Sequence, residues 1–511
     1  MSGLLSPADG MAIDGHGNGA PSVTAGASGD GAGLVNADLA PTTKSQRTWR
    51  WNHFASLWIG VVVCIPAYMV AGGLADQGFS PLQAILLVFL GNAIVVVPVL
   101  LLSHPGTRYG IPFAILARAA FGVRGAALPA MARALVGCGW FGIQTWIGGN
   151  AALTLMSLVL GHKLDANPLP ILGISLPQLL AFLGFWAIQL LFVAKGMSAV
   201  RRLETWTAPI KIVACVALLW WAMSHLGGIG TLLSEPSQFV PGGRLEGQFW
   251  KVFWPSLTAM IGFWTTLALS SSDFTRFAAS QKDQIVGQAL GLPVPMALLA
   301  IVSVITTSAT VLIYGKALWD PIALAGNFTG ITVLVCLLVI SIDTVCANTA
   351  ANLVGPAYDF SSLAPRRIGR REGAYLTAFI GMIIMPWKLV ADSNGFIFVW
   401  LVGYSSLLGP IAGVIIAEYW FVSRRKLAVD DLYVRGGSYE YRGGWNPVAL
   451  LALACGALPN LPGFLFAVGP AVFPDPGGFL RELYSHGWLF GVLMAGSVYV
   501  LGVTNGWFRK R

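Results

Sequence analysis

Four polar residues stand inside long apolar stretches of this sequence. Lys211 lies in APIKIVACV and Asp343 lies in VISIDTVCA, and a charge in such surroundings is costly unless it is paired. Each charge is therefore a candidate functional group. Gln144 and Asn352 are amides, and each offers both a hydrogen-bond donor and an acceptor. The chemistry on offer is ion pairing and hydrogen bonding, directed either at a bound molecule or at a neighbouring helix.

The elements that carry these residues have the character of membrane helices. Of the 511 residues, 56% are hydrophobic and only 10% are charged, with a mean hydropathy of +0.70. Soluble proteins carry roughly 25% charged residues. Twelve apolar runs are long enough to cross a bilayer, which takes about 20 residues. They lie near 54–74, 81–103, 127–158, 170–193, 206–225, 250–270, 287–313, 327–354, 374–391, 395–421, 446–466 and 486–507. We therefore predict an all-α membrane protein with twelve transmembrane helices in a lipid bilayer.

The charges predict how the chain is oriented. If the N-terminus is cytoplasmic, most of the 31 Lys and Arg residues fall on the inner side, as membrane proteins prefer. This bias accounts for the net charge of +9 without a nucleic-acid partner. No signal-peptide pattern precedes the first span, so that span is expected to start insertion. We expect the cell (inner) membrane, cytoplasmic termini, and a disordered cytoplasmic tail over 1–43, which is rich in Gly, Ala, Ser and Asp.

Other functional classes lack their signatures. Neither H-E-x-x-H nor G-x-x-x-x-G-K-[ST] occurs, and the six histidines are scattered along the chain. The six cysteines lie in apolar stretches without a CxxC pair, so we expect buried thiols rather than disulfides or zinc ligands. We therefore expect a transporter, with an intramembrane enzyme or a channel as the less favoured classes. No cofactor, no metal centre and no obligate protein partner is expected.

Two of the predicted spans contain helix-breaking residues. The first carries Pro66 near its middle, and Pro removes a helical hydrogen bond. The sixth carries Pro255 and then Gly262. Interrupted helices at corresponding positions of two halves are typical of inverted-repeat transporters with a site near the membrane midplane. The alternative is that Pro and Gly are simply more frequent in membrane helices.

Several stretches together resemble the nucleobase–cation symporter-1 family, which includes permeases for cytosine, uracil, purines, thiamine, allantoin and hydantoins. The resemblance runs from about 49 to 501. The stretches on which the resemblance rests are SLWIGVVVCIPAYMVAGGL, GIPFAILARAAFGVRGA, GWFGIQTWIG, AANLVGPAYDF, MPWKL and LLGPIAGVIIAEYW. It implies the LeuT-type fold, with a ten-helix transport core over 44–425 built from two inverted five-helix repeats. Two additional helices and a cytoplasmic C-terminus would follow over 426–511.

The resemblance also implies which residues hold the substrate. Trp140 matches an indole that stacks on a flat ring, and Trp264 matches a second indole on the other side of that ring. Gln144, one helical turn after Trp140, and Asn352 match two amides that hydrogen-bond the ring. Indoles supply stacking area and amides supply donors and acceptors, which suits a planar heterocycle with alternating N–H and C=O groups.

Three further positions follow from the resemblance. Cys64 faces the pocket where the hydantoin member has an amide, and the loss of that hydrogen-bonding group argues against a bulky hydantoin. Leu401 matches the position at which the tenth helix can occlude the pocket. Asp273 matches an acidic position at the cytoplasmic end of the sixth helix, where we expect a structural role.

The sodium site of the family is damaged in this sequence. The resemblance places its ligands at the backbone carbonyls of Gly60, Val63 and Asp343 and at two side-chain hydroxyls. At those two hydroxyl positions this chain has Cys346 and Ala347. Sodium is a hard cation that prefers oxygen ligands, and neither of these side chains supplies one.

Lys211 and Asp343 suggest a substitute for sodium. Because the fifth helix of the LeuT-type fold lines the same region, we hypothesise that the two residues pair and place an ammonium where sodium would sit. Protonation of Asp343 or deprotonation of Lys211 would then gate the transport cycle. The alternative is a static salt bridge that joins two helices.

These observations predict a secondary active transporter that imports a planar nucleobase-like heterocycle. Uracil, allantoin or a related pyrimidine or hydantoin is the expected substrate, and H⁺ is the expected coupling ion. The alternative within the same class is a sodium-coupled hydantoin or allantoin symporter.

Overall fold

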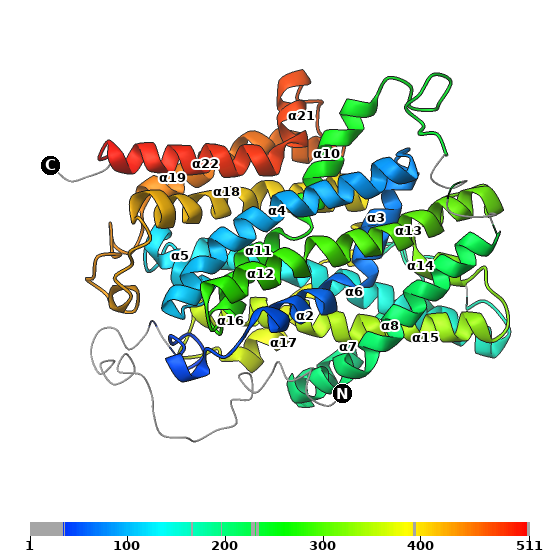
Figure 1. Ribbon diagram of the computed structural model, residues 1–511, viewed down its shortest axis with the longest axis horizontal. Helices are drawn as coiled ribbons and strands as arrows, with labels where there is room; N and C mark the ends of the chain where they lie inside the picture. The colour runs from blue at the N-terminus through cyan, green and yellow to red at the C-terminus, as the bar shows by residue number, and fades with distance from the viewer. Residues whose placement is uncertain are drawn as a thin grey trace.

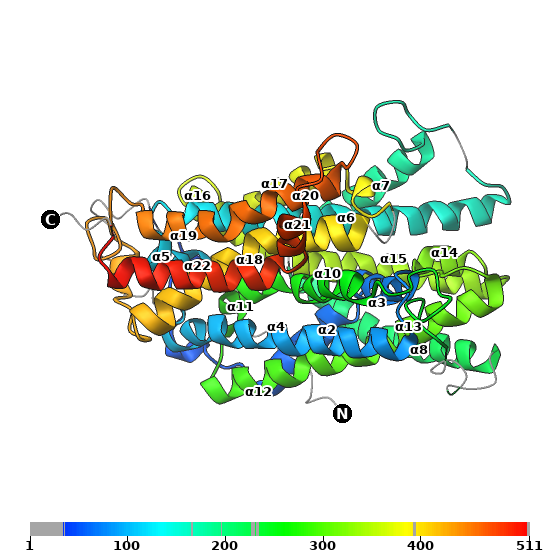
Figure 2. The same ribbon diagram turned by 90° about the horizontal axis from the view of Figure 1, so that it is seen from above.

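The computed structural model describes residues 34, 36–164, 167–195, 197–225, 230, 235–391 and 395–507. These residues form an elongated bundle in which most of the long helices run roughly along one common direction (Figures 1 and 2). Extended pairing within the described part of the chain is limited to three isolated bridges. The prediction of an all-α protein is confirmed.

Eight helices in the described residues are long and apolar enough to cross a membrane, and a bent pair makes a ninth span. The eight are Pro81–Tyr109, Ala127–Leu160, Phe249–Thr275, Gln281–Tyr314, Ile331–Leu363, Gly395–Val422, Pro447–Val468 and Gly487–Thr504. The other predicted spans coincide with α7 (Leu176–Lys195) and α8 (Met197–His225), whose apolar parts are shorter, and with α17 (Arg370–Ile383), whose first turn is charged. The fold is therefore consistent with twelve spans.

The first span is broken in the structure. Helix α2 (Trp51–Val62) and helix α3 (Ile65–Asp76) meet at an angle of 61°. Between them Cys64 has an extended backbone, with φ −142° and ψ 159°. Pro66 lies in the first turn of α3, where its missing N–H has no helical partner to lose. The predicted interruption is confirmed, although the proline begins the second half rather than kinking a continuous helix.

The sixth span is broken more gently. Helix α10 (Phe249–Gly262) and helix α11 (Thr265–Thr275) are separated by Phe263 and Trp264, and together they still form one span. The hydroxyl of Tyr404 donates to the carbonyl oxygen of Gly262 over 2.8 Å. This bond satisfies a backbone group that the break frees, which a membrane interior requires. Pro255 stays inside α10.

The last helices form a layer on one side of the bundle. Helices α19 (Pro447–Ala457) and α22 (Gly487–Thr504) lie beside α18 (Val402–Ile416), as Figures 1 and 2 show. The contact between α18 and α22 is close, because a Cβ added to Gly413 would come within 2.3 Å of the Val492 carbonyl oxygen. These helices occupy the place in the chain where two additional helices were predicted.

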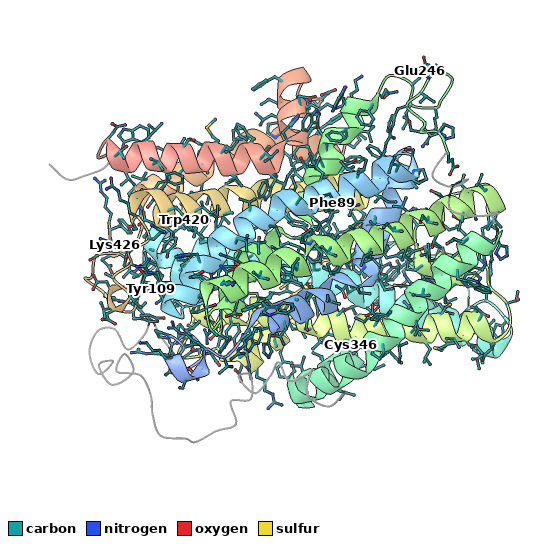
Figure 3. All side chains as sticks on the ribbon, viewed as in Figure 1. Phe89, Tyr109, Glu246, Cys346, Trp420 and Lys426 are labelled. Carbon is teal, nitrogen blue, oxygen red and sulfur yellow. The ribbon has the colours of Figure 1, made fainter. Side chains whose placement is uncertain are left out.

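The N-terminal segment packs against one end of the bundle. The side chain of Leu39 is fully buried, and Asn36 Nδ2 donates to Ser361 Oγ over 2.8 Å. The same end carries Tyr109 and Lys426 (Figure 3). The disordered tail predicted over 1–43 is therefore too long at its C-terminal boundary. Residues 1–33 lie outside the described residues, but 36–43 are held by contacts that their polar composition concealed.

Buried Arg118 ties this end together. It lies in α5 (Phe113–Phe121) and donates to the carbonyl oxygens of Leu432 and Leu34 over 2.9 and 2.7 Å. Burial lowers the pKa of its guanidinium to about 10, so the group stays charged at neutral pH. One side chain thus fixes the N-terminal segment to the loop after α18.

Helices α6 (Ala127–Leu160) and α17 touch where both carry glycine. A Cβ added to Gly142 would lie 2.3 Å from the carbonyl oxygen of Gly381. A Cβ added to Gly381 would lie 2.7 Å from the carbonyl oxygen of Cys138. Small residues of this kind let membrane helices approach closely.

Gly142→Ala should therefore destabilise the protein by about 1–3 kcal/mol, because backbone atoms must move to admit the methyl group. Gly184→Ala in α7 is the matched control, since a Cβ there meets no atom within 4 Å in the described residues. The control should be neutral or slightly stabilising, as alanine favours helix. The check is the melting temperature of each purified variant in detergent. A Gly142→Ala variant that melts as high as Gly184→Ala would contradict the close contact.

Candidate functional site

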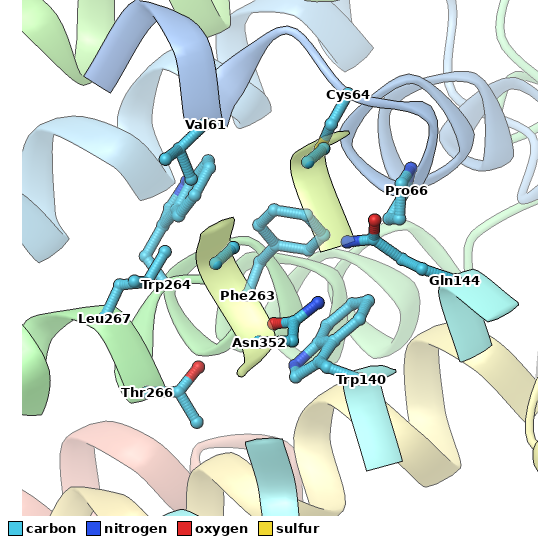
Figure 4. A pocket seen from close by; sticks show the side chains of 12 residues that line it. Val61, Cys64, Pro66, Trp140, Gln144, Phe263, Trp264, Thr266, Leu267 and Asn352 are labelled. Carbon is cyan, nitrogen blue, oxygen red and sulfur yellow. The ribbon is translucent and has the colours of Figure 1, made fainter. Parts of the chain in front are cut away.

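A cavity lies where the two broken spans meet α6 and α15 (Ile331–Asn352), as Figure 4 shows. Both helix breaks supply lining residues, and so do the middle of α6 and the last turns of α15. The lining consists of Val61, Cys64, Pro66, Trp140, Gln144, Phe263, Trp264, Thr266, Leu267, Ala347, Ala351 and Asn352. Five of the six residues predicted to bind substrate therefore line one cavity.

The two predicted indoles reach the cavity from different elements. Trp140 projects from α6, and Trp264 stands in the break between α10 and α11. Their side chains are 4% and 1% exposed, so each is held by packing. Phe263 makes edge-to-face contact with both, with ring centroids 5.2 Å from Trp140 and 4.7 Å from Trp264. The indole N–H of Trp264 finds no hydrogen-bond partner in the described residues, which leaves a buried donor beside the cavity.

The two predicted amides also point into the cavity (Figure 4). Gln144 lies one turn after Trp140 on α6, and its Oε1 is buried without a hydrogen-bond partner among the described residues. A buried polar atom left in this way costs free energy unless something binds it. Asn352 Nδ2 donates to Asn348 Oδ1 over 2.9 Å. The site therefore offers an unused acceptor close to two aromatic faces.

Of the other two predicted substrate positions, Cys64 lines the cavity and Leu401 does not. Cys64 lines the cavity at the start of α3, and its side chain is 8% exposed. Leu401 is fully buried at the start of α18, with its carbonyl oxygen 3.0 Å from the place of a Cβ on Gly262. It packs behind the helix break and does not line the cavity in this structure.

An ion pair lies beside the first break. Lys211 Nζ forms an ion pair with Asp343, and it also donates to the Val63 carbonyl oxygen over 3.2 Å. Both charged side chains are buried, with 9% and 6% of their areas exposed. The pairing hypothesised from the sequence is thus formed, and the carbonyl that the break frees at Val63 is satisfied by an ammonium.

The remaining residues of the expected sodium site lie on α2 and on α15, the helix that carries Asp343. Gly60 lies in the last turns of α2, and a Cβ added to it would meet no atom within 4 Å in the described residues. Cys346 is fully buried on α15, while Ala347 faces the cavity. In the described residues no group of three or more His, Cys, Asp and Glu is arranged to hold a metal ion.

A second buried ion cluster was missed by sequence reasoning. Arg133 of α6 binds Asp359 of α16 (Val354–Leu363) through two bonds of 2.6 Å and Asp273 of α11 through one of 2.8 Å. The backbone N–H of Phe113 donates to Asp273 over 2.8 Å. These bonds agree with the structural role expected for Asp273. The available signal was a lone arginine inside an apolar span, which implies a buried partner.

A polar network behind the cavity was missed as well. Thr145, Gln189 and Asn348 are fully buried and bonded to one another. The available signal was the spacing of Asn348, which lies one helical turn before Asn352. Gln189 stands in the fourth span, and nothing in the sequence connects it to the third and eighth.

The comparisons with known proteins agree with this geometry. A family model described as permease for cytosine/purines, uracil, thiamine, allantoin matches residues 41–491. The chain is 44% identical over 469 residues to a purine-uracil permease of Arabidopsis thaliana, covering 91% of this chain and 77% of that protein. It is 37% identical over 474 residues to an allantoin permease of Bacillus subtilis, covering 92% and 93%.

Solved structures are similar too. A nucleobase-cation-symport-1 family transporter in a closed conformation with bromovinylhydantoin bound matches with a TM-score of 0.72 and 25% identity, covering 92% of this chain and 95% of that one. The inward-facing conformation of the same transporter matches with a TM-score of 0.73 and 24% identity, covering 93% and 95%.

The comparisons define a membrane transporter rather than an enzyme. The chain belongs to the nucleobase–cation symporter-1 family, the permeases for cytosine/purines, uracil, thiamine and allantoin. The predicted LeuT-type fold is confirmed by the similarity to that family's solved structure.

Proposed function

We propose that this protein imports a planar nucleobase-like heterocycle across the inner membrane, with uracil and allantoin as the leading candidates. The observation that carries this proposal is the cavity in which Trp140 and Trp264 meet the amides of Gln144 and Asn352. Relatives named as a purine-uracil permease and an allantoin permease support the same choice.

The chemistry of the cavity suits such a ring. Indole faces favour flat π-systems, and stacking of a base on an aromatic side chain contributes about 1–3 kcal/mol. The Gln144 amide would bond a ring N–H or C=O group, and the Trp264 N–H would donate to a ring carbonyl. Rings with alternating N–H and C=O groups present both, whereas a purely apolar ring would leave these atoms unsatisfied.

We propose that the termini are cytoplasmic and that the substrate enters from outside. With this orientation most Lys and Arg residues fall on the inner side, in keeping with the preference of membrane proteins. The end of the bundle that carries the N-terminal segment, Arg118 and Lys426 is then the cytoplasmic end.

We further propose that transport is coupled to protons through Lys211 and Asp343. The ammonium of Lys211 sits beside the Val63 carbonyl, one of the positions expected to bind sodium. If Asp343 takes up a proton, the ammonium loses its buried counter-ion and the arrangement becomes unfavourable. Coupling to sodium is the alternative. It would require the Lys211 ammonium to move away from the Val63 carbonyl oxygen, so that a sodium ion could bind there.

Replacing the indoles should weaken ring binding. Trp140→Ala and Trp264→Ala should each raise the Kd of the preferred ring about 10-fold or more, because each removes one stacking face. Fluorescence titration of the purified protein with uracil, allantoin, cytosine and hydantoin is the measurement. Trp220→Ala is the matched control, since that indole is 71% exposed on the outside of the bundle.

The titration decides the proposal. A wild-type protein that binds one of these rings, with the loss confined to the cavity variants, supports it. If Trp140→Ala and Trp264→Ala both bound the ring as tightly as Trp220→Ala, the cavity would not be the substrate site.

A further inference from the structure

Three buried polar side chains stand behind Asn352. Thr145 lies on α6, Gln189 on α7 and Asn348 on α15, and none of them is exposed. Each comes from a different helix, so their contacts join three spans at the depth of the cavity. They do not line the cavity themselves.

The hydrogen bonds in this network run in one direction. Thr145 Oγ1 donates to the Phe141 carbonyl oxygen over 2.7 Å, and Gln189 Nε2 donates to Thr145 Oγ1 over 2.8 Å. Asn348 Nδ2 donates to Gln189 Oε1 over 2.7 Å and to the Phe141 carbonyl oxygen over 2.9 Å. Asn352 Nδ2 then donates to Asn348 Oδ1 over 2.9 Å.

The direction is fixed at one end by a backbone carbonyl. The Phe141 oxygen can only accept, so Thr145 and Asn348 must both turn donors toward it. A flipped Asn348 amide would place its oxygen against the Phe141 oxygen and against Gln189 Oε1. A flipped Gln189 amide would bring its nitrogen against the Asn348 nitrogen. Each flipped amide would leave two buried acceptors, or two buried donors, facing each other without a hydrogen bond. Such an arrangement is costly in a low-dielectric interior.

The consequence reaches the cavity through Asn352. Because Asn348 presents only its oxygen, the Asn352 amide must turn its nitrogen toward Asn348. The Asn352 oxygen is thereby left on the other side of the amide; in Figure 4 it points away from Gln144, toward the side of Thr266 and Leu267, two other residues of the cavity lining. Gln144 Oε1 has no hydrogen-bond partner in the described residues, but Figure 4 shows Gln144 turning its nitrogen toward Asn352 and its oxygen toward Pro66.

We propose that Asn348 and Gln189 are positioning residues that determine specificity. They hold the Asn352 amide in one of its two orientations, so that Asn352 presents its carbonyl oxygen to the ring and reads an N–H group there. This inference rests on the proposed function and sharpens it. The substrate class is a ring with at least one unsubstituted N–H group, and methylation of the nitrogen that meets Asn352 should be strongly discriminated against.

The test compares a ring with its N-methylated forms. For wild type and variants, the Kd of uracil, 1-methyluracil and 3-methyluracil is measured on the purified full chain, with allantoin and its N-methyl derivatives as the second set. Asn348→Leu keeps the size of the side chain but frees the Asn352 amide to rotate. The ratio of the Kd of the methylated ring to that of the parent ring should fall about 10-fold, about what one hydrogen bond is worth.

Three further variants separate positioning from stability. Asn348→Asp should keep most of the discrimination, because a buried, protonated acid donates to Gln189 and still accepts from Asn352. Gln189→Met should also lower the ratio of the two Kd values, but by a smaller factor. It replaces Asn348→Leu as the test variant if Asn348→Leu fails to fold. Thr349→Val, next to Asn348 on α15, removes a hydroxyl whose bond within the described residues goes to Val345 of the same helix, and it should leave the ratio unchanged.

The outcomes distinguish the two proposals. If wild type binds none of these rings, the proposed function fails and this inference fails with it. If wild type binds a ring and discriminates against its N-methyl form, but Asn348→Leu and Gln189→Met keep the full ratio, the positioning role is overturned and the proposed function stands.

Discussion

Replacing Arg133 with methionine should destabilise the folded protein by about 3–5 kcal/mol, the largest effect expected of any single substitution here. The guanidinium is 2% exposed and binds Asp359 and Asp273 at once. It also donates to Ser270 Oγ over 3.0 Å and stands 4.2 Å from the centre of the Phe113 ring. Its removal leaves two buried carboxylates without a counter-charge.

Geometry makes lysine a poor substitute at this position. Arg133 reaches both oxygens of Asp359 through Nε and Nη2, each over 2.6 Å, and turns Nη1 to Asp273 over 2.8 Å. A lysine ammonium is a point charge and cannot reproduce this planar fork. Arg133→Lys should therefore recover only part of the stability. The combination of Arg133→Met with Asp273→Asn and Asp359→Asn should recover more, because it removes the uncompensated charges.

The measurement is thermal unfolding in detergent, with the fraction of folded protein at each temperature monitored by size-exclusion chromatography. Arg481→Met is the matched control, because Arg481 forms an exposed ion pair with Asp475, at 3.3 Å and with side chains 63% and 51% exposed. Such a surface pair is worth about 0–1 kcal/mol, so this variant should melt like wild type. An Arg133→Met variant that also melts like wild type would show that the buried cluster does not hold the three helices together.

Replacing Lys211 with methionine should abolish substrate accumulation driven by a pH gradient. With one proton carried per ring, a gradient of one pH unit supplies about 1.4 kcal/mol, which supports about tenfold accumulation. Without the ammonium, Asp343 keeps a proton throughout the cycle and the gradient has nothing to act on. Lys211→Met should therefore equilibrate the ring across the membrane without concentrating it, and so should Lys211→Met combined with Asp343→Asn.

Uptake into proteoliposomes with imposed gradients measures this effect. Wild type should accumulate the ring under an inward proton gradient and should not do so under a sodium gradient alone. Lys316→Met, an exposed lysine in the connection between α13 (Pro293–Tyr314) and α14 (Pro321–Ala325), should behave as wild type. Strong stimulation of wild type by sodium alone would contradict the proposed role of Lys211, as would full proton-driven accumulation by Lys211→Met.

Much of this fold could be predicted because bilayer thickness sets the length of each apolar run. The break in the first span was predicted from Pro66, but its exact place depends on Cys64 being extended. Leu401 was placed at the cavity by resemblance alone, and its actual position behind the break at Gly262 depends on the packing of α18. Residues 36–43 read as a tail because one buried leucine among small and polar residues gives no periodic pattern.

The buried networks could not be predicted for a different reason. Arg133 and Asp359 are 226 residues apart, and Gln189 and Asn348 are 159 residues apart. Helical periodicity tells which residues share a face of one helix, but not which faces meet. Pairing of Lys211 with Asp343 was proposed only because the family fold brings the fifth and eighth spans together.

Counterflow exchange tests the central claim, that this cavity carries a planar ring by alternating access, most directly. Proteoliposomes are loaded with unlabelled uracil or allantoin and diluted into a trace of the same labelled ring. The account predicts a transient accumulation of label inside loaded vesicles, absent from empty ones and lost when Trp140 and Trp264 are both replaced by alanine. Exchange that persisted without both indoles, or no exchange of any ring by a well-folded wild-type protein, would contradict it.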